Sequence, residues 1–145
     1  MDKKENIVVG SDHGGFPLKE AVKERLQRMG CAVVDVGCFS LDSVDYPDYA
    51  EKVVNLIVGG DCRRGILICG TGIGMSIAAN RNPGIRAANC HNLYTAEMSR
   101  EHNDANVLCL GARVLDKELA MDIVDTWMKT EFAGGRHQVR IDKFR

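Results

Sequence analysis

A glycine-rich segment that begins at Cys69 holds the residue types best suited to chemistry. It reads Cys69-Gly70-Thr71-Gly72-Ile73-Gly74 and follows the apolar run 65–69, so we expect it to lead from a strand into a helix. Glycines in such a turn let a ligand approach the backbone closely, and the free N–H groups at the start of a helix bind anions and oxyanions. The same helix start favours a thiolate, which makes Cys69 a candidate nucleophile or base.

Known loop motifs exclude several roles for this segment. A dinucleotide-binding G-x-G-x-x-G would need glycine where Met75 or Ile77 stands, and the lysine of a Walker A loop is replaced by Thr71. The phosphatase C-x5-R loop fails at Met75, and a G-x-C-x-G nucleophile elbow fails at Leu67 and Thr71. A general base is therefore the favoured role of Cys69, with a tight turn that binds no ligand as the alternative.

Two further segments bring titratable side chains next to strand ends. Asp12 and His13 follow the apolar run 6–10, where a carboxylate and an imidazole can orient hydroxyls, exchange protons or bind phosphate. A plain turn is the alternative there. His102-Asn103-Asp104 lies between a predicted helix and the run 106–110, and we expect it at the carboxyl edge of the sheet, with His102 as a general acid.

Basic residues near the C-terminus could hold a phosphate group. Arg136 and Arg140 are four residues apart and share one face if this segment is helical, which gives a fork suited to phosphate. A solvated charged face is the more ordinary interpretation of such a pair, and the residues alone leave both open. His91, just after the run 85–89, is more typical of a surface histidine than of a site residue.

The elements that must position these residues follow from the hydrophobic pattern. Nearly continuous apolar runs predict strands, and their lack of in-and-out alternation favours strands covered on both faces, as in a parallel sheet. Helices are predicted at 16–29 and 46–58, each with an early proline and a glycine after its end, and after Asp116, which can cap a helix. The predicted strands are 6–10, 32–37, 65–69, 85–89 and 106–110.

Strands that alternate with helices imply right-handed crossovers and an α/β fold. The simplest arrangement is a three-layer αβα sandwich around a five-stranded parallel sheet, Rossmann-like or flavodoxin-like, with strand order 2-1-3-4-5. In that order the switch point falls between the first and third strands, so a ligand should lie where the loop after Gly10 meets the loop after Cys69. The fold thus brings together the segments with the most unusual chemistry.

Length and composition exclude several classes of protein. With 145 residues, 45% of them hydrophobic and 27% charged, we expect a single domain, 1–145, rather than a disordered or multidomain chain. The 19 Lys and Arg against 20 Asp and Glu give a net charge of −1, which argues against a nucleic-acid partner. We find no apolar stretch long enough for a signal peptide or a membrane span, and therefore expect a cytoplasmic protein with no membrane partner.

The six cysteines are predicted to be free thiols. The sequence has no C-x-x-C pair, and its closest cysteines, Cys31 with Cys38 and Cys62 with Cys69, are seven residues apart. A disulfide framework is typical of smaller exported chains, and zinc sites need Cys or His at shorter spacing. No metal site is therefore expected, and most of these thiols should be small buried hydrophobic residues.

Five segments of the chain form one larger pattern: Ser11-Asp12-His13-Gly14-Gly15-Phe16, Asp45-Tyr46-Pro47, Gly65 to Gly74, Arg100-Glu101-His102-Asn103-Asp104 and Gly134-Gly135-Arg136-His137-Gln138. This pattern resembles the type B ribose-5-phosphate isomerase family nearly end to end. The resemblance implies an aldose–ketose isomerase of sugar phosphates that needs no metal or other cofactor. It also implies a homodimer, with a tetramer as the alternative, whose active sites lie between subunits. Residues 132–145 would then be a C-terminal tail that packs on a partner subunit.

The resemblance also implies a role for each candidate residue. Cys69 would move a proton between C2 and C1 of the sugar, while the amides from Gly70 to Gly74 hold the enediolate oxygen and His102 assists ring opening. Sugar hydroxyls would contact Asp12, Tyr46, Thr71 and Asn103, and the phosphate would lie among His13, Arg113, Arg136 and Arg140.

The substrate stays open at this point. Ribose 5-phosphate, interconverted with ribulose 5-phosphate, is the substrate that the resemblance implies. A six-carbon sugar phosphate, galactose 6-phosphate or allose 6-phosphate, is the first alternative, because the sequence does not set the distance from aldehyde to phosphate. A module that binds a phosphorylated ligand without converting it is the second, although it leaves Cys69 and His102 without a role.

Overall fold

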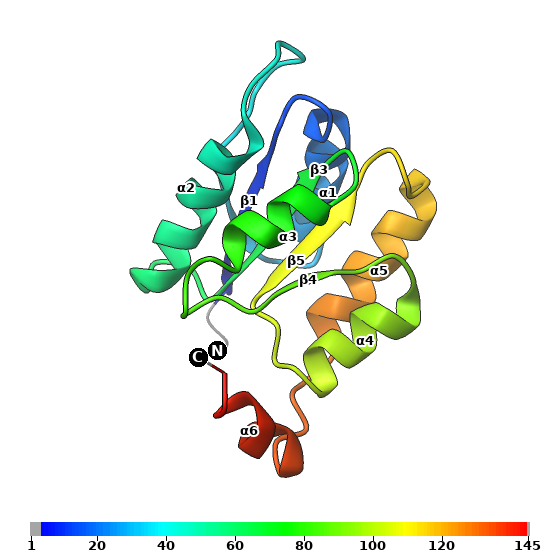
Figure 1. The fold of residues 1–145 in the computed structure, drawn as a ribbon. Helices are drawn as coiled ribbons and strands as arrows, with labels where there is room; N and C mark the ends of the chain where they lie inside the picture. Colours follow the sequence, from blue (N-terminus) through cyan, green and yellow to red (C-terminus); the bar gives the residue numbers. More distant parts are fainter. Residues whose placement is uncertain (1–3, 145) are drawn as a thin grey trace.

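Five parallel strands form one sheet in the computed structural model, which describes residues 4–144 (Figure 1). The strands are β1 (Asn6–Ser11), β2 (Ala32–Asp35), β3 (Arg64–Cys69), β4 (Ala87–Asn89) and β5 (Val107–Gly111). Each coincides with a predicted run to within two residues at either end. The order across the sheet is β2-β1-β3-β5-β4, and every pairing is parallel.

Six helices lie within residues 4–144: α1 (Phe16–Arg28), α2 (Tyr46–Val58), α3 (Ile73–Ala79), α4 (Leu93–Glu101), α5 (Lys117–Lys129) and α6 (Arg136–Ile141). Helices α1, α4 and α5 cover one face of the sheet, and α2 and α3 cover the other. The predicted three-layer αβα sandwich is therefore confirmed. Helix α6 stands apart from these layers, beyond the edge where the strands begin (Figure 1).

The predicted order of the last two strands is wrong, because β5 lies between β3 and β4. All five residues of β5 are buried, and this strand pairs with β3 on one side and β4 on the other. Strand β4 has only three residues, Ala-Ala-Asn, and all of them are partly exposed. The longer apolar strand takes the inner position because it buries more apolar surface there, and the short strand forms the edge.

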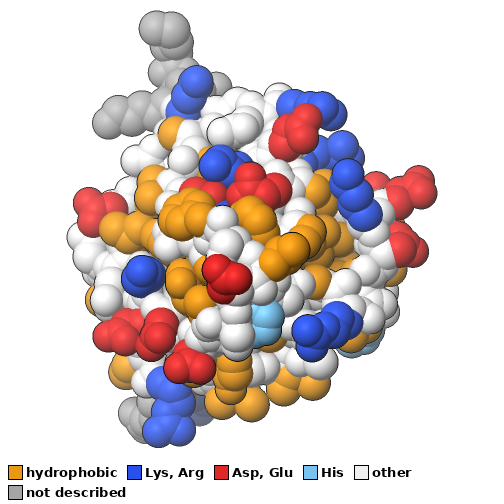
Figure 2. Space-filling view, turned by 90° about the horizontal axis from the view of Figure 1, so that it is seen from above, with side chains coloured by type: hydrophobic (Ala, Val, Ile, Leu, Met, Phe, Trp, Pro, Cys, Tyr) orange, Lys and Arg blue, Asp and Glu red, His pale blue; other side chains and the backbone are white. Residues whose placement is uncertain are grey.

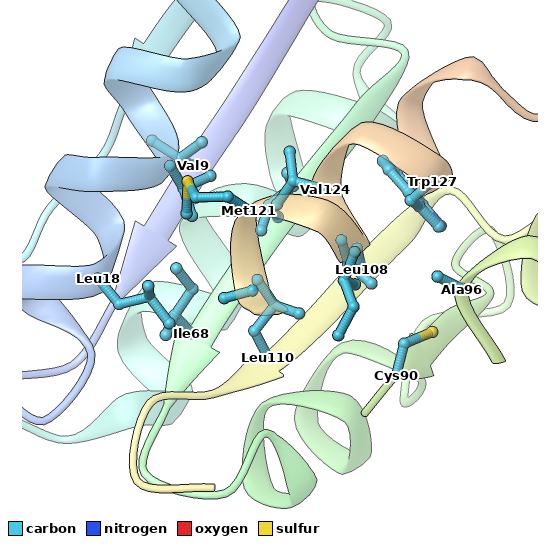
Figure 3. Packing of buried hydrophobic residues seen from close by; sticks show 14 of the residues in the cluster. Val9, Leu18, Ile68, Cys90, Ala96, Leu108, Leu110, Met121, Val124 and Trp127 are labelled. Atoms are coloured by element: carbon cyan, nitrogen blue, oxygen red, sulfur yellow. The ribbon is translucent and has the colours of Figure 1, made fainter. Parts of the chain in front are cut away.

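Each face of the sheet has its own apolar core. One lies beneath α1, α4 and α5 and includes Ile68, Leu110 and the fully buried Trp127 (Figure 3). The other lies beneath α2 and α3 and includes Cys69 and Met75. Full burial of a large aliphatic side chain contributes about 1.5–3 kcal/mol, so strands packed on both faces form a rigid frame for the loops at their ends.

The helix ends agree with the predicted signals. The Asp116 carboxylate accepts a hydrogen bond from the Leu119 N–H at 2.8 Å, as a cap of α5 should. Helices α1 and α2 each have their proline in the first turn. Between residues 4 and 144, every helix falls short of the length that a bilayer span requires.

Candidate active site

Cys69 ends β3, at the edge of the sheet where the strands finish. Its side chain is buried in the core beneath α2 and α3, and its Sγ accepts a hydrogen bond from the Gly72 N–H at 3.2 Å. Gly72 immediately precedes α3 and has a φ of +81°, a left-handed conformation that favours glycine. This turn aims an N–H group at the sulfur and fixes the direction in which the thiol points.

The loop after Cys69 also presents donors that the protein itself does not use. The Thr71 Oγ1 accepts from the Ile73 N–H at 3.2 Å. The backbone N–H groups of Thr71 and Gly74, in contrast, have no acceptor among residues 4–144. An oxygen atom that gains negative charge during a reaction could accept from these groups without any rearrangement of the loop.

Two side chains from other elements pack against this loop. Tyr46 begins α2, and its ring lies so close to Gly74 that a Cβ at Gly74 would stand 2.7 Å from the Tyr46 Cζ. Asn89 ends β4 and places its amide oxygen against Gly72. Tyr46 was predicted as a substrate contact, and the structure brings it to the loop. Asn89 was not predicted, because one asparagine at the end of an apolar run has no distinctive spacing.

Asp12 and His13 lie on the loop between β1 and α1, next to the end of β3. The Asp12 N–H donates to the Ile68 carbonyl at 3.2 Å, and the Asp12 Oδ1 accepts from the Gly15 N–H at 3.0 Å. The His13 Nδ1 accepts from the Val44 N–H at 3.1 Å, so the neutral ring carries its proton on Nε2. The loops after β1 and β3 therefore meet, as the switch point predicts.

Arg113 follows β5, and its exposed side chain lies against the same loops. Its backbone N–H donates to the Gly70 carbonyl at 2.9 Å, and its guanidinium passes beside Gly14 and Gly70. Figure 2 looks onto this end of the molecule and shows apolar, acidic and basic side chains side by side, with a histidine near the middle. We refer to Asp12, His13, Tyr46, residues 69–74 and Arg113 as the carboxyl-edge cluster.

His102 and Asn103 lie at the end of the sheet where the strands begin, so their predicted position at the carboxyl edge, where the strands finish, is wrong. His102 directly follows α4, which leads into the start of β5, and in a parallel sheet such connections lie where the strands begin. The end of β5, in contrast, pairs Gly111 with Cys69. Five residues make β5 about 16 Å long. His102 and Cys69 of one chain therefore cannot both touch the reacting carbons of one sugar.

A second histidine, His137 in α6, stacks on His102. The ring centroids are 4.1 Å apart and the ring planes differ by 13°. Partial burial, together with the electrostatic effect of the neighbouring His102 and of the positive charges of Arg136 and Arg140, lowers the pKa of His137, while Glu101 acts in the opposite direction. A role for His137 was not predicted, because contact between residues so far apart in the chain leaves no local signal.

Arg136 and Arg140 share one side of α6, so the tail is helical as their spacing requires. Helix α6 has no buried residue, and neither arginine has an acidic partner within residues 4–144. A hollow of about 750 Å³ beside this helix is lined by residues that include Asn103, Ile141 and Phe144. We refer to His102, Asn103, Arg136, His137 and Arg140 as the amino-edge cluster.

The remaining cysteines are free thiols, as predicted. Cys38, Cys62, Cys90 and Cys109 are buried, and Cys31 is partly buried. Burial raises the pKa of Cys31, Cys62, Cys90 and Cys109, which keeps these four thiols protonated near neutral pH. Within residues 4–144, no three His, Cys, Asp or Glu side chains gather as the ligands of a metal ion would.

Comparison with known proteins gives consistent matches. The family model described as Ribose/Galactose Isomerase matches residues 7–144. Ribose-5-phosphate isomerase B of Escherichia coli is 49% identical over 136 residues, which cover 94% of this chain and 91% of that protein. The structure of Clostridium thermocellum ribose-5-phosphate isomerase B shares 57% identity with a TM-score of 0.94, over 95% of this chain and 93% of that one. The structure of a Thermotoga maritima ribose 5-phosphate isomerase shares 52% identity with a TM-score of 0.95, over 98% of both chains. By sequence, by fold and by the motif around Cys69, the chain belongs to the Ribose/Galactose Isomerase family.

Proposed function

We propose that this chain interconverts ribose 5-phosphate and ribulose 5-phosphate by proton transfer through an enediolate. The observation that carries the proposal is the Cys69 thiol, which lies beside the unused N–H groups of Thr71 and Gly74. A base next to preorganised donors is what an aldose–ketose isomerisation requires. Relatives whose names state this activity support the choice of substrate.

Cys69 acts as the base in this mechanism. As a thiolate it removes the proton from C2 of the open-chain aldose, and the electron pair moves toward the C1 carbonyl oxygen. The enediolate oxygen then accepts hydrogen bonds from the loop N–H groups, each worth about 3–4 kcal/mol in the transition state. Cys69 returns the proton to C1, and the O2 hydroxyl proton passes to O1. The product is the ketose, with a carbonyl at C2 and a hydroxyl at C1.

The other carboxyl-edge residues hold the substrate. Asp12 uses Oδ1 within its own loop, which leaves Oδ2 for a sugar hydroxyl. Tyr46 and Thr71 supply further hydroxyl contacts beside the loop. The Nε2 proton of His13 and the exposed guanidinium of Arg113 are donors suited to the phosphate, whose binding energy fixes the position of the reacting carbons.

A complete site, in this proposal, takes its two clusters from two subunits of a homodimer. Ring opening by His102, a hydroxyl contact from Asn103 and phosphate binding by Arg136 and Arg140 all require residues far from Cys69 of the same chain. The absence of buried residues in α6 supports a tail that packs on a partner. A two-fold axis would give each site the carboxyl-edge cluster of one chain and the amino-edge cluster of the other. A tetramer of such dimers and a cytoplasmic location stay predictions.

Incubation of the purified protein with ribose 5-phosphate, followed by measurement of ribulose 5-phosphate, tests the proposed reaction. Galactose 6-phosphate and allose 6-phosphate are the matched comparisons, since each has one more carbon between aldehyde and phosphate. We expect the highest kcat/KM for ribose 5-phosphate. A higher value for a six-carbon substrate would overturn the assignment of substrate, and binding of all three without conversion would overturn the assignment as an enzyme.

A further inference from the structure

Arg100 is a buried side chain beside the amino-edge cluster that the proposed mechanism does not use. It lies in the last turn of α4 and is only 6% exposed. Its Nη1 donates to the Asp104 Oδ1 at 3.0 Å and to the Ala105 carbonyl at 2.7 Å. The turn between these contacts and α4 carries His102 and Asn103. Arg100 therefore closes the turn that presents them.

The same guanidinium also reaches the chain that leads into the tail. Its Nε donates to the Thr130 carbonyl at 3.3 Å, directly after α5. Three residues later, the Ala133 N–H donates to the Glu101 carbonyl at 3.0 Å. These bonds tie the connection between α5 and α6 to the end of α4, and Arg136 follows only a few residues on.

Asp104 holds the turn in an unusual conformation. Its φ is +46°, the only positive φ of a non-glycine residue among residues 4–144. Arg86 secures the same residue from the other side, with Nε 3.0 Å from the Asp104 carbonyl oxygen and Nη2 3.5 Å from Oδ2. A left-handed aspartate between two arginines is typical of a turn whose shape is fixed by its surroundings.

We propose that Arg100 is a positioning residue, which fixes His102 in relation to Arg136 and Arg140 so that one partner subunit presents them together to the sugar. This inference rests on the proposed function, because it assigns a purpose to the amino-edge cluster. Arg100 touches no substrate atom in this role. It acts through the turn at 102–105 and through the connection at 130–135.

An anion-binding role for the same arginine is disfavoured. Arg63, Arg64, Arg100 and Lys129 line a hollow of about 440 Å³, but Asp104 and Glu131 line it too. Arg64 already pairs with Glu5 through two hydrogen bonds of 2.7 and 2.8 Å and donates to the Trp127 and Met128 carbonyls. These carbonyls belong to the C-terminal end of α5, whose dipole repels an anion.

Arg64 is a matched control for Arg100. Both guanidiniums are buried, both bind carbonyls at the end of α5, and both lie over the Trp127 ring, at 5.0 and 5.8 Å from its centroid. Only Arg100 also holds the turn of His102. Arg64→Ala and Arg100→Ala should therefore lower the thermal midpoint together, and only Arg100→Ala should disturb the amino-edge cluster.

The first measurement is the pKa of His137, followed by NMR of its ring protons. It is lowered in the native chain by the contact with His102 and by nearby positive charges. We expect Arg100→Ala to raise it toward the ordinary value of about 6.5, because the stack loosens, and Arg64→Ala to leave it unchanged. This readout needs no substrate, so it stands even if the proposed reaction is wrong. If the pKa of His137 is the same in folded Arg100→Ala as in the native chain, the inference is overturned.

The second measurement separates ring opening from proton transfer. Ribulose 5-phosphate has its 5-hydroxyl esterified and stays open chain, so deuterium uptake from D₂O reports on Cys69 without ring opening. We expect Arg100→Ala to lower ribose 5-phosphate turnover relative to this uptake on the order of 10- to 100-fold, the cost of misplacing a group by about 1 Å. An equal fall of both rates, or the same ratio change in Arg64→Ala, would contradict a positioning role.

Two further experiments complete the test, the first with a variant that serves also if Arg100→Ala folds poorly. Arg100→Lys keeps the charge near Asp104 but cannot reach the Ala105 and Thr130 carbonyls at once, so it should change both readouts in the same direction and less strongly. Added guanidinium ion should restore the turnover ratio of Arg100→Ala and not that of His102→Asn. The inference would be overturned if Arg100→Lys kept both the native pKa of His137 and the native turnover ratio. It would also be overturned if guanidinium ion failed to restore the turnover ratio of folded Arg100→Ala.

Discussion

The carboxyl-edge and amino-edge clusters are built in different ways. Cys69 ends a fully buried strand, and hydrogen bonds from the loops after β1 and β5 hold the end of this strand and the start of the loop that follows it. Arg136 and Arg140, in contrast, lie on a six-residue helix without a buried residue, joined to α5 through Gly134 and Gly135. The first cluster is positioned by the core of its own chain. The second is held by hydrogen bonds between the end of α4 and the connection from α5 to α6, and by the contacts of Arg86 with Asp104.

This difference suggests that the two clusters serve different steps of the proposed reaction. Proton transfer needs a base and oxyanion donors placed within fractions of an ångström, which the packed end of a parallel sheet can provide. Phosphate binding and ring opening use groups that, in the proposed dimer, come from a second subunit. If the proposed dimer is correct, the exposed cluster is covered only where it meets the buried one.

Cys69→Ala should have the largest effect on the carboxyl-edge cluster. Loss of a general base lowers kcat on the order of 10²- to 10⁴-fold, and deuterium uptake into ribulose 5-phosphate should fall with it, because both need the same proton transfer. Cys62→Ala, a substitution of a buried cysteine in the same core, is the control and should keep its activity. Substantial turnover by folded Cys69→Ala would remove the thiol from the mechanism.

His102→Asn should slow ring opening, which the amino-edge cluster performs in the proposed mechanism, far more than proton transfer, which the carboxyl-edge cluster performs. Ribose 5-phosphate turnover should fall about 10²-fold, because the furanose must open first, whereas deuterium uptake into open-chain ribulose 5-phosphate should stay near the native rate. Parallel loss of both rates would show that His102 acts in proton transfer rather than in ring opening.

Mixing two inactive variants tests whether the clusters of one site come from different chains. After subunit exchange between Cys69→Ala and Arg136→Ala, one site of each mixed dimer carries both defects and the other is intact. Random exchange should recover about a quarter of native activity for a two-fold dimer. Recovery is measured against each variant alone, with exchange verified by mass-labelled chains. If proven exchange restores nothing, Arg136 and Cys69 of a site belong to one chain or Arg136 has no role.

Asp35→Asn should affect stability far more than turnover. Lys19 is fully buried and pairs with Asp35 at 2.6 Å. Removal of the carboxylate leaves that charge with only the half-exposed Glu20, and breaking such a pair costs about 3–5 kcal/mol in the free energy of unfolding. Lys19→Met should cost less, because Asp35 keeps Lys23 and the Gly37 N–H. Urea unfolding measures both, and equal losses would contradict this account.

The ion pair of Lys19 with Asp35 also predicts how the free energy of unfolding depends on pH. Burial alone would raise the pKa of Asp35, but hydrogen bonds from Lys19 and from the Gly37 N–H lower it below its ordinary value. The folded state then holds the proton less tightly than the unfolded chain. The resulting stability is present above the unfolded pKa of about 3.9 and is lost as the pH falls through the lower folded pKa. Urea unfolding down to about pH 3 should show a flatter acid limb in Asp35→Asn than in the native chain.

The sequence predicts the carboxyl-edge cluster well because its signals are local. Apolar runs locate the strands, and the motif that starts at Cys69 follows one of them directly. Parallel pairing then brings the loops after β1 and β3 together, whatever the order of the outer strands. The meeting of Asp12 with the end of β3 is therefore predictable without knowledge of β4 and β5.

The amino-edge cluster is harder to predict because its contacts join distant parts of the chain. The position of His102 does follow from topology, since a residue between a helix and the next parallel strand must lie where the strands begin. The stacking of His137 on His102 and the reach of Arg100 to Thr130 depend on tertiary packing and have no periodicity. The exchanged order of β4 and β5 follows from burial, which the shortness of the Ala-Ala-Asn strand only hints at.

The direction of the C-terminal tail depends on a backbone conformation at Gly135 that L residues rarely adopt. Its φ of +57° and ψ of −128° are the mirror image of −57° and +128°, which lies near the polyproline II region that L residues favour. A Cβ added there would meet no heavy atom within 4 Å, so space is not the constraint. D-alanine would suit this backbone, whereas L-alanine would turn the chain elsewhere and carry Arg136 and Arg140 with it. The positive-φ conformation of one achiral residue thus aims both guanidinium groups.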